Sequence, residues 1–419
     1  MATSSAIERD LRSILAVQAL RAFAYGFASV LLGASLADGG FSPTQVGLVF
    51  TAMLAGNAIV SIGVGTFGER IGRRRLYALL LALMGLAGSV YAFVDALWVL
   101  VLVALTGTLS TDPNESGPIT SIEQAMMGSS PRDVRARVFG RYNAVAYLAG
   151  AAGALAAGGP ELLRRSVPSI PTDQRWLLLF AFVALGGVAI SARLSPAVES
   201  AAPTTGRPLQ RSRSTVARLA ALFGLDAFAG GFVVSTFLAY WFSLRFGTST
   251  EAIGAVLFGV GILQAGSSVV SGRLAGRIGL LNTMVFTHHP SNILLALVPL
   301  MPSLGLAVAM LLMRSTLSQM DVPARQAYVV TMVDPSERTA ATAYTNTARY
   351  LVRPFGAAAA GLAMQRVALG APFVIAGMLK VVYDLALYAT FRRVPLPEEA
   401  EASTTPAPRS SSNEQGPAR

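Results

Sequence analysis

Three kinds of residue are missing or scarce in this chain of 419 residues, and each shortage excludes a class of protein. Cysteine is absent, so the chain has no disulfide, no thiolate nucleophile and no cysteine–metal site. Histidine occurs only at two adjacent positions, which do not share a helix face, so we expect no metal site. Charged residues make up 13% of the chain, against about 25% in soluble domains. Most of the chain is therefore expected to avoid water.

Long apolar runs take the place of the missing charges. Hydrophobic residues make up 53% of the chain, and the mean hydropathy is +0.55. A helix needs about 20 apolar residues to cross a bilayer. The runs are continuous rather than alternating, which favours membrane helices over a membrane β-barrel. Charged or Gly/Pro-rich turns separate twelve predicted spans: 13–36, 42–67, 76–94, 96–127, 138–158, 176–194, 215–246, 250–274, 281–301, 304–332, 339–367 and 372–391.

A polar stretch near the middle of the chain separates two sets of predicted spans. We expect one helical bundle at 1–194, a cytoplasmic linker at 195–214, a second bundle at 215–391 and a disordered cytoplasmic tail at 392–419. Arginine gathers in the loops that follow even-numbered spans, as in the run from position 73 to position 75. Because positively charged loops stay in the cytoplasm, we expect a multi-pass protein of the bacterial inner membrane with both termini cytoplasmic.

An internal repeat relates the two sets of spans. Residues 21–27 (RAFAYGF) match residues 226–232 (DAFAGGF), at an offset of 226 − 21 = 205, and residues 69–72 (ERIG) match residues 276–279 (GRIG), at an offset of 276 − 69 = 207. Shorter matches that start at positions 124 and 143 have offsets of 202 and 203. We therefore predict an all-α membrane protein with twelve transmembrane helices in two pseudo-symmetric six-helix bundles, the architecture of transporters that move two halves around a central site.

The loop between the second and third spans carries a motif. Residues 65–74 read GTFGERIGRR, which resembles the loop signature G-x-x-x-D-R-x-G-R-R of the major facilitator superfamily, with Glu69 in place of Asp. In that family the acid and the arginines of this loop hold the two halves together on the cytoplasmic side. The resemblance therefore implies a cytoplasmic gate at Glu69, Arg70 and Arg73. The chain is also similar to the family's drug/proton antiporters, although its fourth span departs from their signature.

Ionisable residues inside predicted spans are costly in a membrane and are candidates for function. At repeat-equivalent positions the two halves carry opposite charges: Arg21 aligns with Asp226, and Asp112 aligns with Arg314. In the superfamily, the four spans that hold these residues line the central cavity. We expect Arg21, Asp112, Asp226 and Arg314 to form a middle layer that binds substrate or protons. Glu115 and Asp321 are expected on the same pathway.

A third opposite-charge match lies nearer the cytoplasm. Glu123 aligns with Arg325 at an offset of 202, and we expect the two residues to form a gating ion pair between the halves. Static pairs that only neutralise buried charge are the alternative for both layers.

The function predicted from these features is secondary transport of a small molecule by alternating access, most simply as proton-coupled efflux. The partners expected are a small-molecule substrate, protons and the lipid bilayer, with a monomeric chain, no nucleic acid and no cofactor. Uptake or exchange of an anionic solute is one alternative, and a transporter-like sensor without flux is another. The chain lacks the G-x-x-x-x-G-K-[ST] phosphate-binding pattern and a nucleophile–base set, so we expect neither ATP coupling nor enzyme activity.

Overall fold

The computed structural model describes residues 2–112, 117–127, 132–171, 173–199, 209–334 and 337–394. No β-strand occurs among them, which confirms the predicted all-α architecture. Residues 200–208 of the predicted linker and 395–419 of the predicted tail lie outside the described residues.

The helices up to residue 199 are called the N-half here, and the helices from residue 213 onward are called the C-half. The N-half contains α1 (Ala2–Asp38), α2 (Pro43–Ile71), α3 (Arg73–Phe93), α4 (Leu97–Ala104), α5 (Pro118–Met127), α6 (Arg132–Ala156), α7 (Gly159–Ser166), η1 (Gln174–Leu178), α8 (Leu179–Ser191) and η2 (Pro196–Glu199). The C-half contains α9 (Arg213–Gly231), α10 (Ser235–Phe246), α11 (Thr250–Ile278), α12 (Leu280–Leu297), η3 (Val298–Leu300), α13 (Leu304–Ser315), α14 (Asp321–Thr331), α15 (Arg338–Arg366) and α16 (Ala371–Phe391).

Seven stretches of the described chain are long and apolar enough to cross a membrane. They are Glu8–Asp38, Pro43–Thr66, Arg73–Phe93, Gln174–Ser191, Arg213–Phe246, Thr250–Ile278 and Ala371–Phe391. The predicted fourth and tenth spans are interrupted: α4 ends 14 residues before α5 begins (118 − 104 = 14), and α13 ends six residues before α14 begins (321 − 315 = 6). In the fourth span the chain turns at Gly107, whose φ is 65° and where a Cβ would lie 2.3 Å from the carbonyl oxygen of Gly56.

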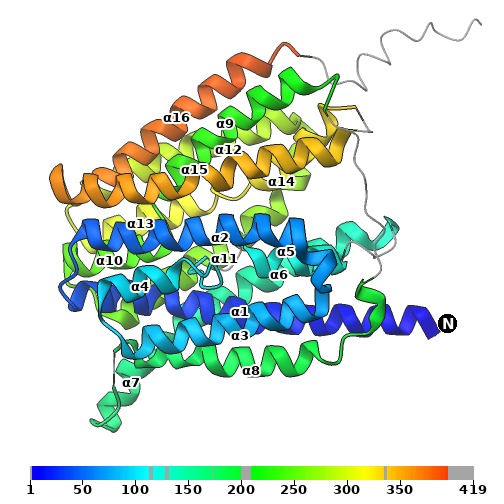
Figure 1. Cartoon of the computed structure of the whole chain (residues 1–419). Helices are drawn as coiled ribbons and strands as arrows, with labels where there is room; N and C mark the ends of the chain where they lie inside the picture. The colour runs from blue at the N-terminus through cyan, green and yellow to red at the C-terminus, as the bar shows by residue number, and fades with distance from the viewer. Residues whose placement is uncertain are drawn as a thin grey trace, which may run out of the picture.

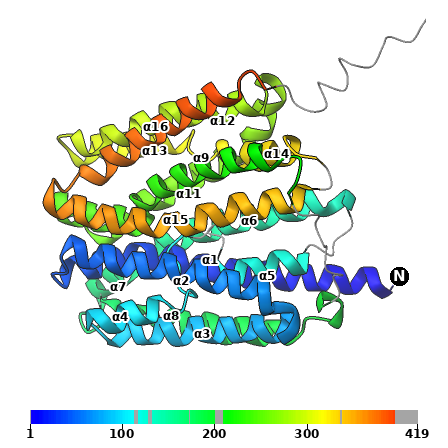
Figure 2. The same cartoon turned by 45° about the horizontal axis from the view of Figure 1, so that its top comes forward.

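The helices run side by side along one direction, with α9, α12, α15 and α16 on one side of the molecule and α1, α3 and α8 on the other (Figure 1). The turned view keeps the same division between C-half and N-half helices (Figure 2). The start of α1 and the end of α16 lie at the same end of the molecule, which we call the terminal end. The other end is called the opposite end.

Equivalent glycine contacts hold each half together. In the N-half, a Cβ on Gly153 of α6 would lie 1.9 Å from the carbonyl oxygen of Phe23 in α1. In the C-half, a Cβ on Gly356 of α15 would lie 2.0 Å from the carbonyl oxygen of Phe228 in α9. The separations 228 − 23 = 205 and 356 − 153 = 203 are offsets of the sequence repeat. The repeat is therefore present in the packing, where glycine brings equivalent helices into backbone contact.

The two halves pack closely together toward the opposite end. Between α2 and α15, a Cβ on Gly47 would lie 2.9 Å from the Cα of Gly361, and between α11 and α6, a Cβ on Gly254 would lie 2.5 Å from the carbonyl oxygen of Ala154. Polar contacts support this end: Tyr240 donates to the Phe41 carbonyl at 2.8 Å, and Arg165 pairs with Glu251 at 2.6 Å. Small residues allow the helices of different halves to approach to backbone distance.

At the terminal end, Glu337 fixes the start of α9. Its carboxylate accepts hydrogen bonds from the backbone N–H groups of Gln210, Arg211 and Ser212, at 2.7, 2.9 and 2.9 Å. These donors lower the pKa of Glu337 from 4.5 to about 2, because they stabilise the charged form. The positive end of the helix dipole favours a negative charge at the same place.

We expect the substitution Glu337→Gln to lower the melting temperature at neutral pH, because an amide oxygen accepts hydrogen bonds more weakly than a carboxylate. The folded-state pKa lies below the ordinary value, so the stabilisation is present above pH 4.5 and is lost as the pH falls toward about 2. Melting curves followed by tryptophan fluorescence should separate wild type and variant at neutral pH and converge in acid. A matched change at the exposed Glu8, Glu8→Gln, should have little effect; a pH-independent difference for Glu337→Gln contradicts the prediction.

Candidate functional site

A buried ion pair lies at the centre of the N-half. Arg21 of α1 donates to Glu123 of α5 at 2.6 Å, and the two side chains are 2% and 0% exposed. The second carboxylate oxygen of Glu123 accepts a hydrogen bond from the Tyr77 hydroxyl of α3 at 2.7 Å, and Tyr142 of α6 also donates to the carboxylate. The guanidinium further donates to Gln18 and Thr120. Four helices thus surround one neutral, hydrogen-bonded pair.

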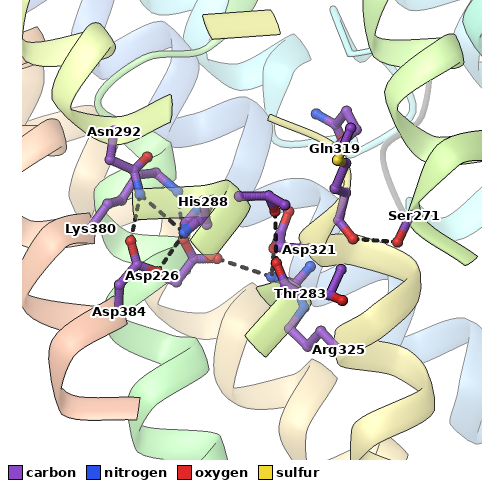
Figure 3. A network of polar contacts seen from close by, with 12 residues as sticks. Asp226, Ser271, Thr283, His288, Asn292, Gln319, Asp321, Arg325, Lys380 and Asp384 are labelled. Atoms are coloured by element: carbon purple, nitrogen blue, oxygen red, sulfur yellow. Dashed lines mark hydrogen bonds and ion pairs between the residues drawn. The ribbon is translucent and has the colours of Figure 1, made fainter. Parts of the chain in front are cut away.

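A larger charged network lies inside the C-half. Asp226 of α9 accepts from Lys380 of α16 at 2.5 Å and from Arg325 of α14 at 3.1 Å. Arg325 also contacts Asp321, one turn earlier on α14, at 3.1 Å. The side chains come from three helices and meet in the interior (Figure 3), where none of these residues is more than 9% exposed.

Histidine joins this network to a further carboxylate. His288 of α12 contacts Asp384 of α16 through Nδ1 at 2.8 Å, and its Nε2 lies 3.8 Å from Asp226. Asn292, one turn later on α12, donates to Asp384 at 3.0 Å (Figure 3). One imidazole ring therefore stands between two buried carboxylates.

The two central pairs are equivalents in the repeat, with their charges exchanged. Arg21 corresponds to Asp226 and Glu123 to Arg325, so the pair Arg21–Glu123 has its counterpart in Asp226–Arg325. Glu123 and Arg325 do not pair with each other in this conformation, because each is paired within its own half. The gating role of Glu123 and Arg325 and the middle layer of Arg21, Asp112, Asp226 and Arg314 stay predictions.

Other predicted site residues lie elsewhere. Asp112 pairs across the halves with Arg353 of α15 at 3.3 Å. Arg314 lies in the last turn of α13, and Asp321 begins α14. Glu115 lies outside the described residues.

The predicted gate loop contacts its own half in this conformation. Arg73 donates through its backbone N–H to Glu199 at 2.6 Å and through its side chain to the carbonyls of Ala125 and Val198, each at 3.3 Å. Arg70 is exposed in the last turn of α2, and the side chain of Glu69 lies outside the described residues. The assignment of this loop as a gate stays a prediction.

Sequence reasoning missed His288 and the partners of two other residues of the network. Lys380 and Asp384 are four residues apart on one helix, and the i, i+4 spacing rule alone would pair them with each other. In the structure Lys380 instead binds Asp226, and Asp384 binds His288 and Asn292. The useful signal was the spacing of His288 and Asn292, which places two polar side chains on one face of an apolar helix.

Comparison with known proteins identifies the family. The family model described as Major Facilitator Superfamily matches residues 14–357. The chain belongs to the major facilitator superfamily.

Three similar proteins illustrate how widely this superfamily fold is shared. The uncharacterized membrane protein YJR124C of Saccharomyces cerevisiae is 27% identical over 91% of this chain and 94% of its own length. The multidrug efflux pump Tap of Mycolicibacterium fortuitum is 31% identical over 28% of this chain and 27% of its own length. The crystal structure of a bacterial homolog of the human lysosomal transporter Spinster, in an inward-facing and occupied conformation, has a TM-score of 0.70 at 15% identity and covers 91% of this chain and 96% of that chain.

For this superfamily member we expect the substitution Arg21→Ala to destabilise the protein by about 3–5 kcal/mol, because it leaves Glu123 buried without a counter-ion. The matched change Arg12→Ala removes an exposed pair with Glu8 and should cost less than about 1 kcal/mol. Unfolding in detergent by guanidinium chloride measures both. The double variant Arg21→Leu/Glu123→Leu should recover much of the loss, and equal effects of Arg21→Ala and Arg12→Ala would contradict the role of the pair.

Proposed function

We propose that this chain is a secondary transporter that moves a small molecule through a central site by alternating access. In this proposal twelve spans form two six-helix bundles, at 1–194 and 215–391, joined by the linker at 195–214. The pairs α4 with α5, α9 with α10 and α13 with α14 each serve as one interrupted span. Interrupted helices at membrane depth are tolerated where the irregular backbone lies against protein or a water-filled cavity.

One observation carries the proposal: the interface between the halves is built from small residues that recur farther along the same helix faces. Gly47 of α2 and Gly254 of α11 make the close contacts described above. Gly65 follows Gly47 by 18 residues on α2, and Gly272 follows Gly254 by 18 residues on α11 (65 − 47 = 18 and 272 − 254 = 18). Eighteen residues make five turns at 3.6 residues per turn, so each later glycine lies on the same helix face, about 27 Å nearer the terminal end.

These later glycines are unused in the present conformation. Gly65 and Gly272 are exposed, and a Cβ on either would meet nothing within 4 Å. The partner helices also carry small residues toward the terminal end, Gly140 on α6 and Ala343 on α15, and both are exposed. Gly140 and Ala343 are repeat equivalents at an offset of 343 − 140 = 203. A second interface can therefore close the terminal end when the opposite end opens.

We expect a disulfide between Gly65→Cys and Ala343→Cys to form in native membranes under mild oxidation. A disulfide requires Cβ atoms about 3.8 Å apart, and the surroundings of Gly65 exclude such a contact in the present conformation. Because the chain has no cysteine of its own, a shift in gel mobility after oxidation reports only the disulfide between the two introduced cysteines.

The control is the pair Gly63→Cys with Ala343→Cys. Gly63 lies two residues before Gly65, about 160° around α2 from the Gly47 face, and should give no cross-link. Absence of the Gly65–Ala343 cross-link, or equal yields for both pairs, would sink the proposed closure.

Efflux driven by protons is the direction we propose. The arginine-rich loops favour a cytoplasmic terminal end. In this proposal the present conformation, which is closed at the opposite end, opens toward the cytoplasm to collect substrate. The partial match to the multidrug efflux pump Tap supports export. The ring of His288, between Asp384 and Asp226, is the proposed place for the transported proton, because the Glu123 carboxylate is already held by Arg21, Tyr77 and Tyr142.

Uptake or exchange of an anionic solute is a second candidate function. Arg314 and Arg349 favour an anionic solute, though not a direction, because neither side chain has an ion-pair partner among the described residues. Direction of flux separates the two candidates.

We expect compounds selected by thermal shift on the purified protein to release protons from everted vesicles that have been energised to an acidic interior. The variant His288→Gln should abolish the release, because the ring that links Asp384 to Asp226 is lost. The variant His289→Gln should retain it, since the His289 ring lies 3.9 Å from Asp384, beyond hydrogen-bond distance. Release by His288→Gln at the wild-type rate contradicts the proposed proton site, and substrate entry against the expected direction contradicts efflux.

A further inference from the structure

Two arginines in the C-half form no direct ion pair with any residue that the structure describes. Arg314 lies in the last turn of α13 and Arg349 lies in α15. Among the residues that the structure describes, neither guanidinium makes a hydrogen bond or an ion pair, and the Nε of Arg314 is buried without an acceptor. An unpaired cation at membrane depth is costly and marks a candidate binding site.

The acids of the C-half interior are already occupied. Asp226 is bound by Lys380 and Arg325, and Arg325 also holds Asp321. Asp384 is bound by His288 and Asn292. Rearranging these bonds to neutralise Arg314 or Arg349 would leave another buried charge unpaired, which costs more than it gains. A bound anion from outside the chain could therefore neutralise the two arginines without breaking these pairs.

Residues close in the sequence to both arginines contact the other half. Asp321 acts electrostatically on both Arg314 and Arg349. Four residues after Arg349, one turn along α15, Arg353 reaches Asp112 of the N-half at 3.3 Å. Five residues after Arg314, Gln319 accepts from Tyr147 of the N-half at 3.0 Å. Neighbours of both arginines thus touch the other half.

Differences in exposure decide which charge an entering molecule meets. Asp226, Asp321 and Asp384 are 4%, 4% and 0% exposed, whereas Arg314 and Arg349 are half-buried. A solute that enters between the halves during the proposed transport would therefore meet the cations before the acids. Repulsion from Asp321 is reduced because Arg325 lies against that carboxylate at 3.1 Å.

We propose that Arg314 and Arg349 bind the anionic group of the transported molecule, a carboxylate or a phosphate. The planar guanidinium fork donates two parallel hydrogen bonds to either group. The inference rests on the proposed transport function and names the substrate class of its central site. It holds for either direction of flux.

Calorimetric titration of the purified full-length protein tests the site with benzoate, inorganic phosphate and, as the neutral match of benzoate, benzamide. We expect saturable binding of at least one anion and none of benzamide. Arg314→Gln and Arg349→Gln should each weaken anion binding by about tenfold or more, the value of one charge-assisted hydrogen bond. Arg314→Lys, which keeps the charge but loses the fork, should fall between wild type and Arg314→Gln. Arg245→Gln, at an exposed arginine of α10, is the matched control and should bind as wild type does.

Each outcome decides the proposal. Absence of saturable binding by both anions, equal binding of benzoate and benzamide, or unchanged affinity in Arg314→Gln and Arg349→Gln overturns it. If Arg314→Gln fails to fold, as seen by size-exclusion chromatography, Arg314→Lys and Arg349→Gln still decide. Anion binding without flux in proteoliposomes supports the site and contradicts transport, whereas flux of a neutral compound without anion binding supports transport and contradicts the site.

Discussion

Neutralisation of buried charge within a single half is the constraint on which the rest of this structure depends. A charge at membrane depth is costly unless a partner lies beside it. Arg21 and Glu123 satisfy this condition inside the N-half, and Asp226 and Arg325 satisfy it inside the C-half. Because neither pair spans the interface, the halves can change their relative position without separating these charges. The cores remain rigid while the surface between them is free to differ between conformations.

The surface between the halves has a different composition, and under the proposed alternating access it would have to form and break. It relies on glycine and alanine, which allow backbones to approach without interlocking side chains. The few polar links across it, such as Arg353 with Asp112 and Tyr147 with Gln319, are partly buried, so water can replace either partner at modest cost. Close backbone contact without interlocking side chains is compatible with two alternative interfaces along the same helix faces.

The two halves share a repeated helix packing, but their buried polar side chains differ. The carboxylate of the N-half is surrounded by donors from two tyrosines and one arginine, which hold it in place. The C-half adds a histidine between two carboxylates. It also contains two arginines that form no ion pair with the described residues. The proposed proton and substrate sites both rest on these differences.

The sequence by itself determined the all-α membrane character, the repeat and the identity of the charged positions, because hydropathy, spacing and offset are properties of the linear chain. It also brought out Arg21 with Asp226 and Glu123 with Arg325 as opposite-charge equivalents. Only the tertiary structure decided which residues pair. Glu123 pairs with Arg21 rather than with Arg325, and Lys380 pairs with Asp226 rather than with Asp384. Pairing depends on which helices pack together and how each is rotated, and a local spacing rule such as i, i+4 contains neither.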